Sequence, residues 1–172
     1  MMQNVQVLKI TRTKEIIFSA VFTALAIYAP MVVHHFAGVD GGRKFLPMPF
    51  FVLLAGLTLG WRAGIAAGLA SPVISFLLSG MPMLNILPII IIQLSAYGFL
   101  AGILKEKFNG FIAPAGAIVL GLILTGFAVF LFSEMNAAAY VINAVRDGWV
   151  GIALQLLILP IIIKFSRDYL FD

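Results

Sequence analysis

Residues 47–82 read PMPFFVLLAGLTLGWRAGIAAGLASPVISFLLSGMP and contain a single charged residue. Two apolar runs, 47–60 and 62–79, are separated only by Gly60-Trp61-Arg62. Both are shorter than the about 20 residues that a straight helix needs to cross the hydrocarbon core of a bilayer, and Pro72 interrupts the second. We therefore expect a tight hairpin of short or broken membrane helices, whose irregular backbone faces protein or a cavity.

The composition extends this interpretation to the whole chain. Of its 172 residues, 62% are hydrophobic and 10% are charged, and the mean hydropathy is +1.10. A soluble domain carries about 25% charged residues. No water-soluble fold could bury so much apolar surface, so the composition predicts an integral membrane protein, and the length fits a single domain over residues 1–172.

Hydropathy divides the chain into six expected membrane-spanning helices, which makes the expected fold class an all-α integral membrane protein. The expected spans are 14–36, 47–60, 62–79, 86–104, 111–133 and 148–165. The first span lacks a convincing cleavage site, so we expect no signal peptide.

Lys and Arg are unevenly divided between the two expected sides of the membrane. One side holds eight: Lys9, Arg12, Lys14, Arg62, Lys105, Lys107, Lys164 and Arg167. The other side holds three: Arg43, Lys44 and Arg146. The positive-inside rule then predicts that the N- and C-termini are cytoplasmic and that three connecting segments lie outside. The basic residues form no groove or stripe, so the net charge of +4 does not indicate nucleic-acid binding.

Enzymatic and ion-driven functions find little support in the sequence. It has no GxxxxGK[ST] phosphate loop, no HExxH pair and no Cys. His34 and His35 are adjacent, which points their imidazoles in different directions, whereas a metal site requires a spacing of three or four residues. The interiors of the expected spans hold essentially no ionisable residue, which an intramembrane enzyme or an ion-coupled carrier would need. We expect neither catalysis nor a metal.

Polar residues gather in three stretches that we expect to be outer loops, the outer segments 34–44, 79–85 and 133–149, whereas the inner connections are short. Contact with a ligand is therefore expected outside. Asn85 precedes the fourth expected span, and Gln93 and Tyr97 lie within it, four residues apart and so on one helical face.

The third outer segment holds a second group of candidates. Asn136, Tyr140 and Asn143 recur at intervals of four and three, which places them on one face if the segment is helical, and Arg146 and Trp149 follow at similar spacing. An apolar pocket with a few amides, a phenol, an indole and a cation suits a small heteroaromatic or carboxylated ligand. In the alternative interpretation the aromatic residues are interfacial anchors and the amides are merely solvated.

The first span contains the stretch SAVFTALA, residues 19–26, with its small residues on one side of a helical wheel. Small faces let helix backbones approach closely in a membrane. This face could pack within the protein or against a partner.

Three parts of the chain together resemble the substrate-binding S components of energy-coupling factor (ECF) transporters, the prokaryotic vitamin importers. These parts are Ala20-Val-Phe-Thr-Ala24, which matches an AxxxA pattern, residues 47–82, and the run GWVGIALQLLILPIIIKF at 148–165. The resemblance implies a plasma-membrane location, a vitamin pocket facing outward, and three partners: a transmembrane coupling subunit and two cytoplasmic ATPases. It also implies that this chain binds no cofactor, because the ATPases use the ATP.

The resemblance assigns expected roles by position. The substrate-binding candidates are Asn85, Gln93, Tyr97, Glu134, Asn136, Tyr140, Asn143 and Arg146. The first outer segment is expected to gate the pocket through His34, His35, Arg43 and Lys44. Ala20 and Ala24 are expected to dock on the partner. The implied substrate is a vitamin or related micronutrient of the niacin, pantothenate, pyridoxine or flavin type. The alternatives are a stand-alone facilitator or channel, and a structural membrane subunit without a transport role.

Overall fold

The computed structural model describes residues 12–108 and 110–170, and within them every regular element is a helix. The helices are α1 Arg12–Phe45, α2 Pro47–Leu59, α3 Trp61–Ser79, α4 Leu87–Lys107, α5 Ile112–Phe132 and α6 Ala137–Leu170. The described residues include six helical stretches long and apolar enough to cross a membrane. The expected all-α fold with six membrane helices is confirmed.

The hairpin predicted over residues 47–82 is present. The helix α2 has only 13 residues and ends at Gly60, whose φ of 99° lies in a region that favours glycine. The helix α3 begins at the next residue and runs through Pro72 for 19 residues. It is therefore continuous, and α2 is the short member of the pair.

Glycines bring α2, α3 and α4 into backbone contact. A Cβ atom on Gly64 of α3 would collide with the backbone of Gly98 in α4, and a Cβ on Gly98 would collide with Gly64. A Cβ on Gly56 of α2 would also meet the Gly98 carbonyl, and one on Gly102 would meet the backbone of Trp61. We call α2, α3 and α4 the glycine-packed block. Such contacts stabilise membrane helices because small residues maximise dispersion contact between backbones.

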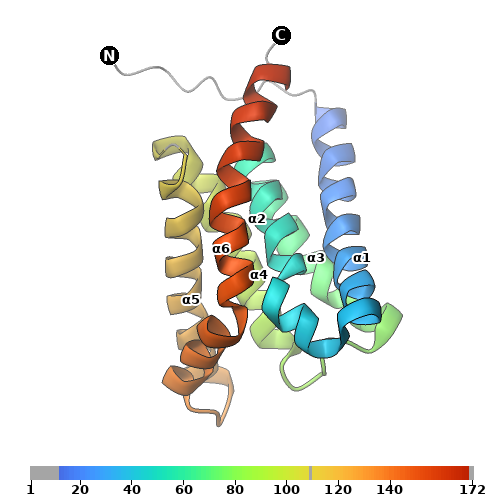
Figure 1. The fold of residues 1–172 in the computed structure, drawn as a ribbon, viewed down its shortest axis with the longest axis vertical. Coiled ribbons are helices and arrows are strands. Elements are labelled where there is room, and N and C mark those ends of the chain that lie inside the picture. Colours follow the sequence, from blue (N-terminus) through green and yellow to red (C-terminus); the bar gives the residue numbers. More distant parts are fainter. Residues whose placement is uncertain (1–11, 109, 171–172) are drawn as a thin grey trace.

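The prediction that residues 34–44 form a loop is wrong. The expected loop 34–44 is mostly helical, because α1 continues to Phe45 and changes direction at Gly38, with φ 66° and ψ −172°. Only glycine adopts this conformation readily. We call residues 38–46 the α1–α2 corner, since they reverse the chain between the two helices (Figure 1).

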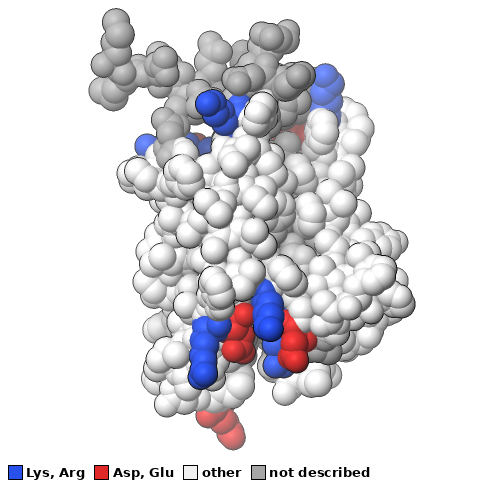
Figure 2. Space-filling view, in the orientation of Figure 1, with Lys and Arg blue, Asp and Glu red and all other residues white. Residues whose placement is uncertain are grey.

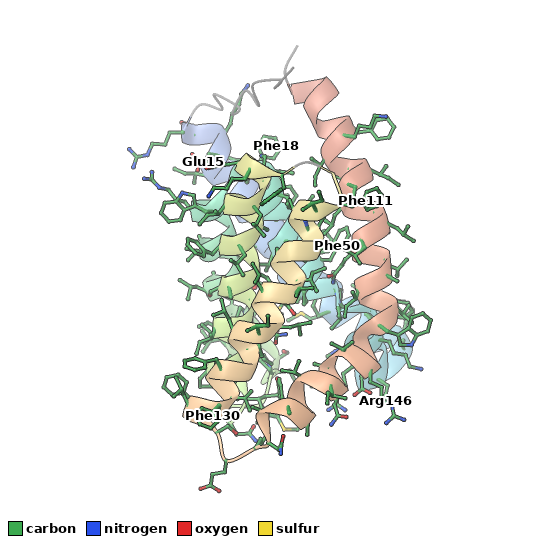
Figure 3. All side chains as sticks on the ribbon, turned by 90° about the vertical axis from the view of Figure 1, so that its left-hand side faces the viewer. Glu15, Phe18, Phe50, Phe111, Phe130 and Arg146 are labelled. Atoms are coloured by element: carbon green, nitrogen blue, oxygen red, sulfur yellow. The ribbon has the colours of Figure 1, made fainter. Side chains whose placement is uncertain are left out.

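The prediction that residues 133–149 form a loop is also wrong for most of that stretch. The span expected at 148–165 begins at Ala137, so most of the expected loop 133–149 is helical. Asn143, Arg146 and Asp147 lower the hydropathy of this segment, but they do not interrupt a helix that starts with three alanines. At about 1.5 Å per residue, the 34 residues of α6 span about 51 Å, well beyond a bilayer core of about 30 Å. Figure 3 shows that α6 bends, with its first turns oblique and Arg146 on that part.

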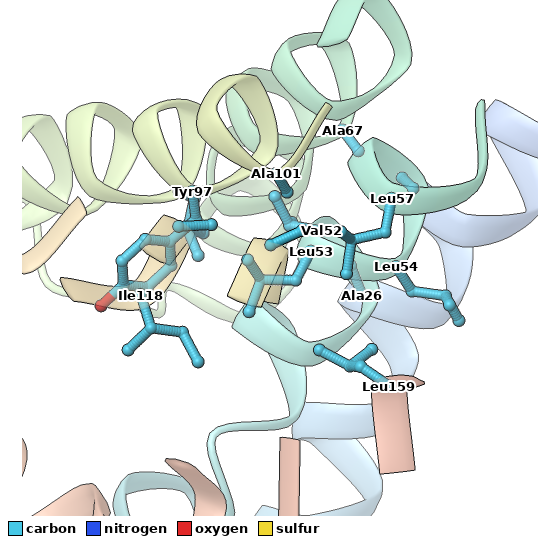
Figure 4. Close-up of a cluster of buried hydrophobic side chains, with 14 residues drawn as sticks. Ala26, Val52, Leu53, Leu54, Leu57, Ala67, Tyr97, Ala101, Ile118 and Leu159 are labelled. Carbon is cyan, nitrogen blue, oxygen red and sulfur yellow. The ribbon is translucent and has the colours of Figure 1, made fainter. Parts of the chain in front are cut away.

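The hydrophobic core lies where α2, α4, α5 and α6 meet. Leu53, Tyr97, Ile118 and Leu159 are buried together there, and Figure 4 shows the Tyr97 ring beside Ile118. Outside this core most large apolar side chains point outward, as lipid-facing side chains do. Phe130, for example, is 72% exposed on α5 (Figure 3).

The described charges divide between the two ends of the bundle (Figure 2). The start of α1 and the end of α6 lie at one end (Figure 1), together with the basic residues Arg12, Lys14, Arg62, Lys105, Lys107 and Lys164. The opposite end carries Arg43, Lys44 and Arg146 beside the acids Asp40, Glu134 and Asp147. Lys9 and the side chain of Arg167, which also entered the predicted asymmetry, lie outside the described residues.

Candidate functional site

Gln93 and Tyr97 form the centre of a polar cluster inside the bundle. They lie one turn apart on α4, and the Gln93 Nε2 donates a hydrogen bond to the Tyr97 hydroxyl oxygen over 3.2 Å. Tyr97 is 5% exposed. Its ring lies against Gly121 of α5, where a Cβ would collide with it. The Gly121 position therefore leaves the room that the phenol occupies between α4 and α5.

Tyr140 of α6 lies near Gln93 and Tyr97, and we include it in this polar cluster. Its side chain is half-buried, and its phenol lies within electrostatic reach of the Tyr97 phenol. The neighbouring Val141 contacts Gly126 of α5, which brings the first turns of α6 onto that helix. Residues from α4 and α6, distant in sequence, thus lie near one another beside α5.

The cluster carries hydrogen-bonding groups without charge. One amide and two phenols supply several donors and acceptors, of which the Gln93–Tyr97 bond uses one donor and one acceptor. Polar groups in a membrane interior are costly unless they find partners, and the hydrogen bond between Gln93 and Tyr97 supplies part of that pairing. The nearby Thr125 hydroxyl is different, because it donates to the Gly121 carbonyl of its own helix over 2.8 Å.

Four other predicted binding residues are exposed at the surface. Asn85 is exposed in the connection between α3 and α4, and Glu134 is exposed between α5 and α6. Asn143 and Arg146 are exposed on α6. The structure thus places Tyr140 near the hydrogen-bonded Gln93 and Tyr97, whereas the side chains of these four residues are exposed.

Asn136 has a role in local structure. Its Oδ1 accepts the Ala139 N–H over 2.9 Å, which is the hydrogen bond of a helix N-cap. This cap begins α6 at the residue after Asn136 and helps to place Tyr140 in the first turns of the helix.

The four residues expected to gate the site lie in or beside the α1–α2 corner. The His34 imidazole packs on Gly42, where a Cβ would collide with it. His35 is exposed and makes an edge-to-face contact with Phe36 at 5.1 Å between ring centroids. Arg43 and Lys44 are exposed in the last turn of α1. Among the residues that the structure describes, no group of three or more His, Cys, Asp or Glu side chains could hold a metal ion.

The helix α6 also contacts the α1–α2 corner, through residues that the sequence did not indicate as part of a site. Gly148 and Gly151 of α6 pack on the α1–α2 corner, and the Gln155 amide donates a hydrogen bond to the Leu46 carbonyl. A sequence signal for this contact exists, because residues 148, 151 and 155 follow the three- and four-residue spacing of one helical face.

The small residues of α1 are divided between the surface and the interior. Ala20 is exposed and Ala24 is half-buried, whereas Ala26 is fully buried in the core. The Thr23 hydroxyl donates to the Ser19 carbonyl over 2.8 Å, so its polarity is satisfied within the helix. Part of the small face is therefore open to a partner.

Six helices long and apolar enough to cross a membrane, packed around an uncharged polar cluster, define the described chain as a multi-pass membrane protein. The family described as ECF transporter, substrate-specific component matches residues 14–163. The chain therefore belongs to this family, as its resemblance to S components predicted. It is a substrate-specific membrane subunit of an ECF transporter and not an enzyme. Comparison with curated proteins and with solved structures gives no match.

Proposed function

We propose that this subunit captures a small water-soluble vitamin or related micronutrient at the cluster of Gln93, Tyr97 and Tyr140. The observation that carries this proposal is the cluster itself, in which the hydrogen-bonded Gln93 and Tyr97 of α4 lie near Tyr140 of α6 beside α5. Its amide and phenols can exchange their mutual contacts for hydrogen bonds to a ligand of similar polarity.

The charges at the same end of the bundle bear on the substrate. Arg146, Arg43 and Lys44 are exposed at the end opposite the termini, where a carboxylate could pair with a cation. This arrangement favours a carboxylated vitamin such as niacin or pantothenate. A pyridoxine or flavin ring could instead stack on Tyr140 or on the exposed Trp149.

The proposed orientation places both termini in the cytoplasm of a prokaryotic cell, with the subunit in the plasma membrane. The excess of Lys and Arg at the terminal end of the described structure supports this orientation. The substrate then enters from outside, at the end that carries the α1–α2 corner and the start of α6.

Family membership implies a substrate and an ECF module with transmembrane and ATPase subunits. We propose that this chain itself binds no cofactor, and that two cytoplasmic ATPases use ATP and act through a transmembrane coupling subunit. We assign the exposed part of the small face of α1, with Ala20 and Ala24, to contact with that coupling subunit.

Binding by the purified subunit tests the proposal. Nicotinate, pantothenate, pyridoxine and riboflavin are titrated into the protein in lipid nanodiscs while tryptophan fluorescence is recorded. The chain has two Trp residues, and the Trp149→Phe variant leaves only Trp61, at the terminal end, as a reference. We expect one compound to quench the wild type with saturation, and the Gln93→Leu variant to bind it more weakly.

Two other results would favour the alternatives. Uptake into vesicles containing the subunit alone, without ATP, would indicate a facilitator. Absence of binding by any vitamin-sized compound would indicate a structural subunit and would contradict the proposal.

A further inference from the structure

Gln155 lies deep in the interior of a membrane helix. It is 2% exposed on α6, and its Nε2 donates a hydrogen bond over 3.2 Å to the carbonyl oxygen of Leu46, a residue 109 positions away in sequence. An amide in an apolar interior is unfavourable unless it is hydrogen-bonded. Its partner is the backbone of the α1–α2 corner and not its own helix.

Leu46 needs support from its surroundings. It has φ 48° and ψ 50°, a left-handed conformation that is unfavourable for a residue with a side chain, and Pro47 follows it. Its N–H donates to Gly42 over 3.1 Å, and its carbonyl also accepts the Phe50 N–H over 3.3 Å. Such a conformation persists only where neighbouring structure holds it.

Two glycines let α6 reach this corner. A Cβ on Gly151 would lie 2.7 Å from the Phe45 carbonyl group and 2.8 Å from the Lys44 carbonyl oxygen. A Cβ on Gly148 would lie 2.7 Å from the Leu46 side chain. The helix therefore approaches the corner backbone to backbone, and Gln155 adds a polar bond one turn further along the same face.

The contact between Gln155 and Leu46 joins the α1–α2 corner to α6, and both segments carry polar residues at the end of the bundle opposite the termini. Arg43 and Lys44 belong to the α1–α2 corner, and Tyr140 and Arg146 belong to the first turns of α6. Both segments lie at the end of the bundle opposite the termini (Figure 1). A displacement of the corner from α6 would change the spacing between these groups.

We propose that Gln155 is a positioning residue for substrate binding, which holds the α1–α2 corner on α6 and so slows the release of a bound molecule. The claim about release rests on the proposed function. The claim that Gln155 holds the corner does not depend on any ligand.

Hydrogen exchange of the intact, ligand-free protein in nanodiscs tests the structural claim. The Gln155→Met variant keeps the side-chain length but removes the donor. A net hydrogen-bond contribution of about 1 kcal/mol corresponds to about 5-fold faster exchange of the amides in residues 38–46, with α3 and α4 unchanged. The Leu159→Met variant, at a fully buried position of the same helix, is the matched control and should exchange like the wild type. Unchanged exchange in Gln155→Met would overturn the proposal.

Release rates test the functional claim. Dissociation of nicotinate, pantothenate, pyridoxine and riboflavin is followed from wild type, Gln155→Met and Leu159→Met. For any probe that binds, we expect about 5-fold faster dissociation from Gln155→Met with an unchanged association rate. Faster exchange without faster dissociation would reduce Gln155 to a structural role and overturn its positioning role.

Lack of ligand binding and misfolding of the Gln155→Met variant can be told apart. If none of the four probes binds the wild type, the proposed function fails, whereas the exchange result still decides whether Gln155 holds the corner. If Gln155→Met does not fold, Gly151→Ala is the second variant, because its Cβ would press on the Phe45 and Lys44 carbonyls. It should accelerate exchange in the corner in the same way, and unchanged exchange would contradict the proposal.

Discussion

The glycine-packed block and the peripheral helices α1 and α6, which we call the outer helices, differ in the share of their residues that is buried within the protein. In the apolar stretch of α4, 44% of residues are buried within the protein, against 11% in that of α1 and 28% in that of α6. The block is held by backbone contacts through Gly56, Gly64, Gly98 and Gly102. The outer helices instead present most of their surface to lipid or to partners.

The comparison shows that small residues serve two purposes in this chain. In α3 and α4 the small residues pack helices of this chain against one another, because Gly64 and Gly98 are in backbone contact. In α1, Ala20 is exposed and contributes little to the described fold. A closely packed block beside a less buried pair of helices suits a subunit that must hold its own structure and also exchange contacts with other molecules.

Breaking the block should have the largest effect. In Gly98→Ala the new methyl group would collide with the backbone of Gly64, so we expect a loss of about 3 kcal/mol of stability or failure to fold. Thermal unfolding in detergent with size-exclusion chromatography measures this. Gly116→Ala is the control, because its methyl group would meet only the flexible end of Leu104 at 3.0 Å. Equal stability of the two variants would show that the block is not closely packed.

Enlarging the exposed small face of α1 should leave the fold intact and impair transport. We expect Ala20→Trp to reduce ATP-driven uptake by at least about 10-fold, because a large side chain keeps a partner helix from close approach. Adding Ala24→Trp should strengthen the effect. Co-purification with the coupling subunit and vitamin uptake measure assembly and transport, and the unfolding temperature checks the fold. The matched control is Val21→Trp, on an exposed neighbouring position. Normal uptake by Ala20→Trp would place the partner elsewhere.

Changes at the polar cluster, where the block meets α6, should weaken binding with little effect on the fold. Tyr97→Phe removes the hydroxyl that accepts the Gln93 hydrogen bond, and we expect about 10-fold weaker vitamin binding, equivalent to about 1.4 kcal/mol. Titration of tryptophan fluorescence measures the affinity. Tyr28→Phe is the control, because Tyr28 is 61% exposed on α1. If the two variants bind equally well, the ligand does not contact Tyr97.

The smallest expected effect concerns the start of α6. Asn136→Ala removes the acceptor of the Ala139 N–H and should cost about 1 kcal/mol of stability. The unfolding temperature measures the loss. Asn143→Ala, at an exposed position on the same helix, should unfold like the wild type. An unchanged unfolding temperature in Asn136→Ala would mean that the first turns of α6 do not depend on their cap.

Much of the fold could be predicted from residue types alone. The apolar runs predicted six membrane helices, since hydrophobicity and segment length decide what can cross a bilayer. The short connection Gly60-Trp61-Arg62 predicted a tight hairpin between two of them. The four-residue spacing of Gln93 and Tyr97 placed both on one face, and the hydrogen bond between them agrees with that spacing.

The ends of α1 and α6 were predicted less well. Hydropathy assigned residues 34–44 and 133–149 to loops because they are polar, yet most of both segments is helical. Polarity reports the cost of entering lipid, whereas helix formation depends on backbone conformation and capping. The Asn136 cap and the change of direction at Gly38 therefore needed coordinates to be recognised.

By itself the sequence determined that this chain is an all-α membrane protein, that its span interiors are essentially uncharged, and that it resembles ECF substrate-binding subunits. These properties are sums over local residue types and need no knowledge of which helix lies beside which. The tertiary structure alone decided that Tyr140 lies near Gln93 and Tyr97, that Gly98 faces Gly64, and that Gln155 bonds to Leu46. Contacts between distant residues depend on how helices pack and bend, and those are collective properties of the folded chain.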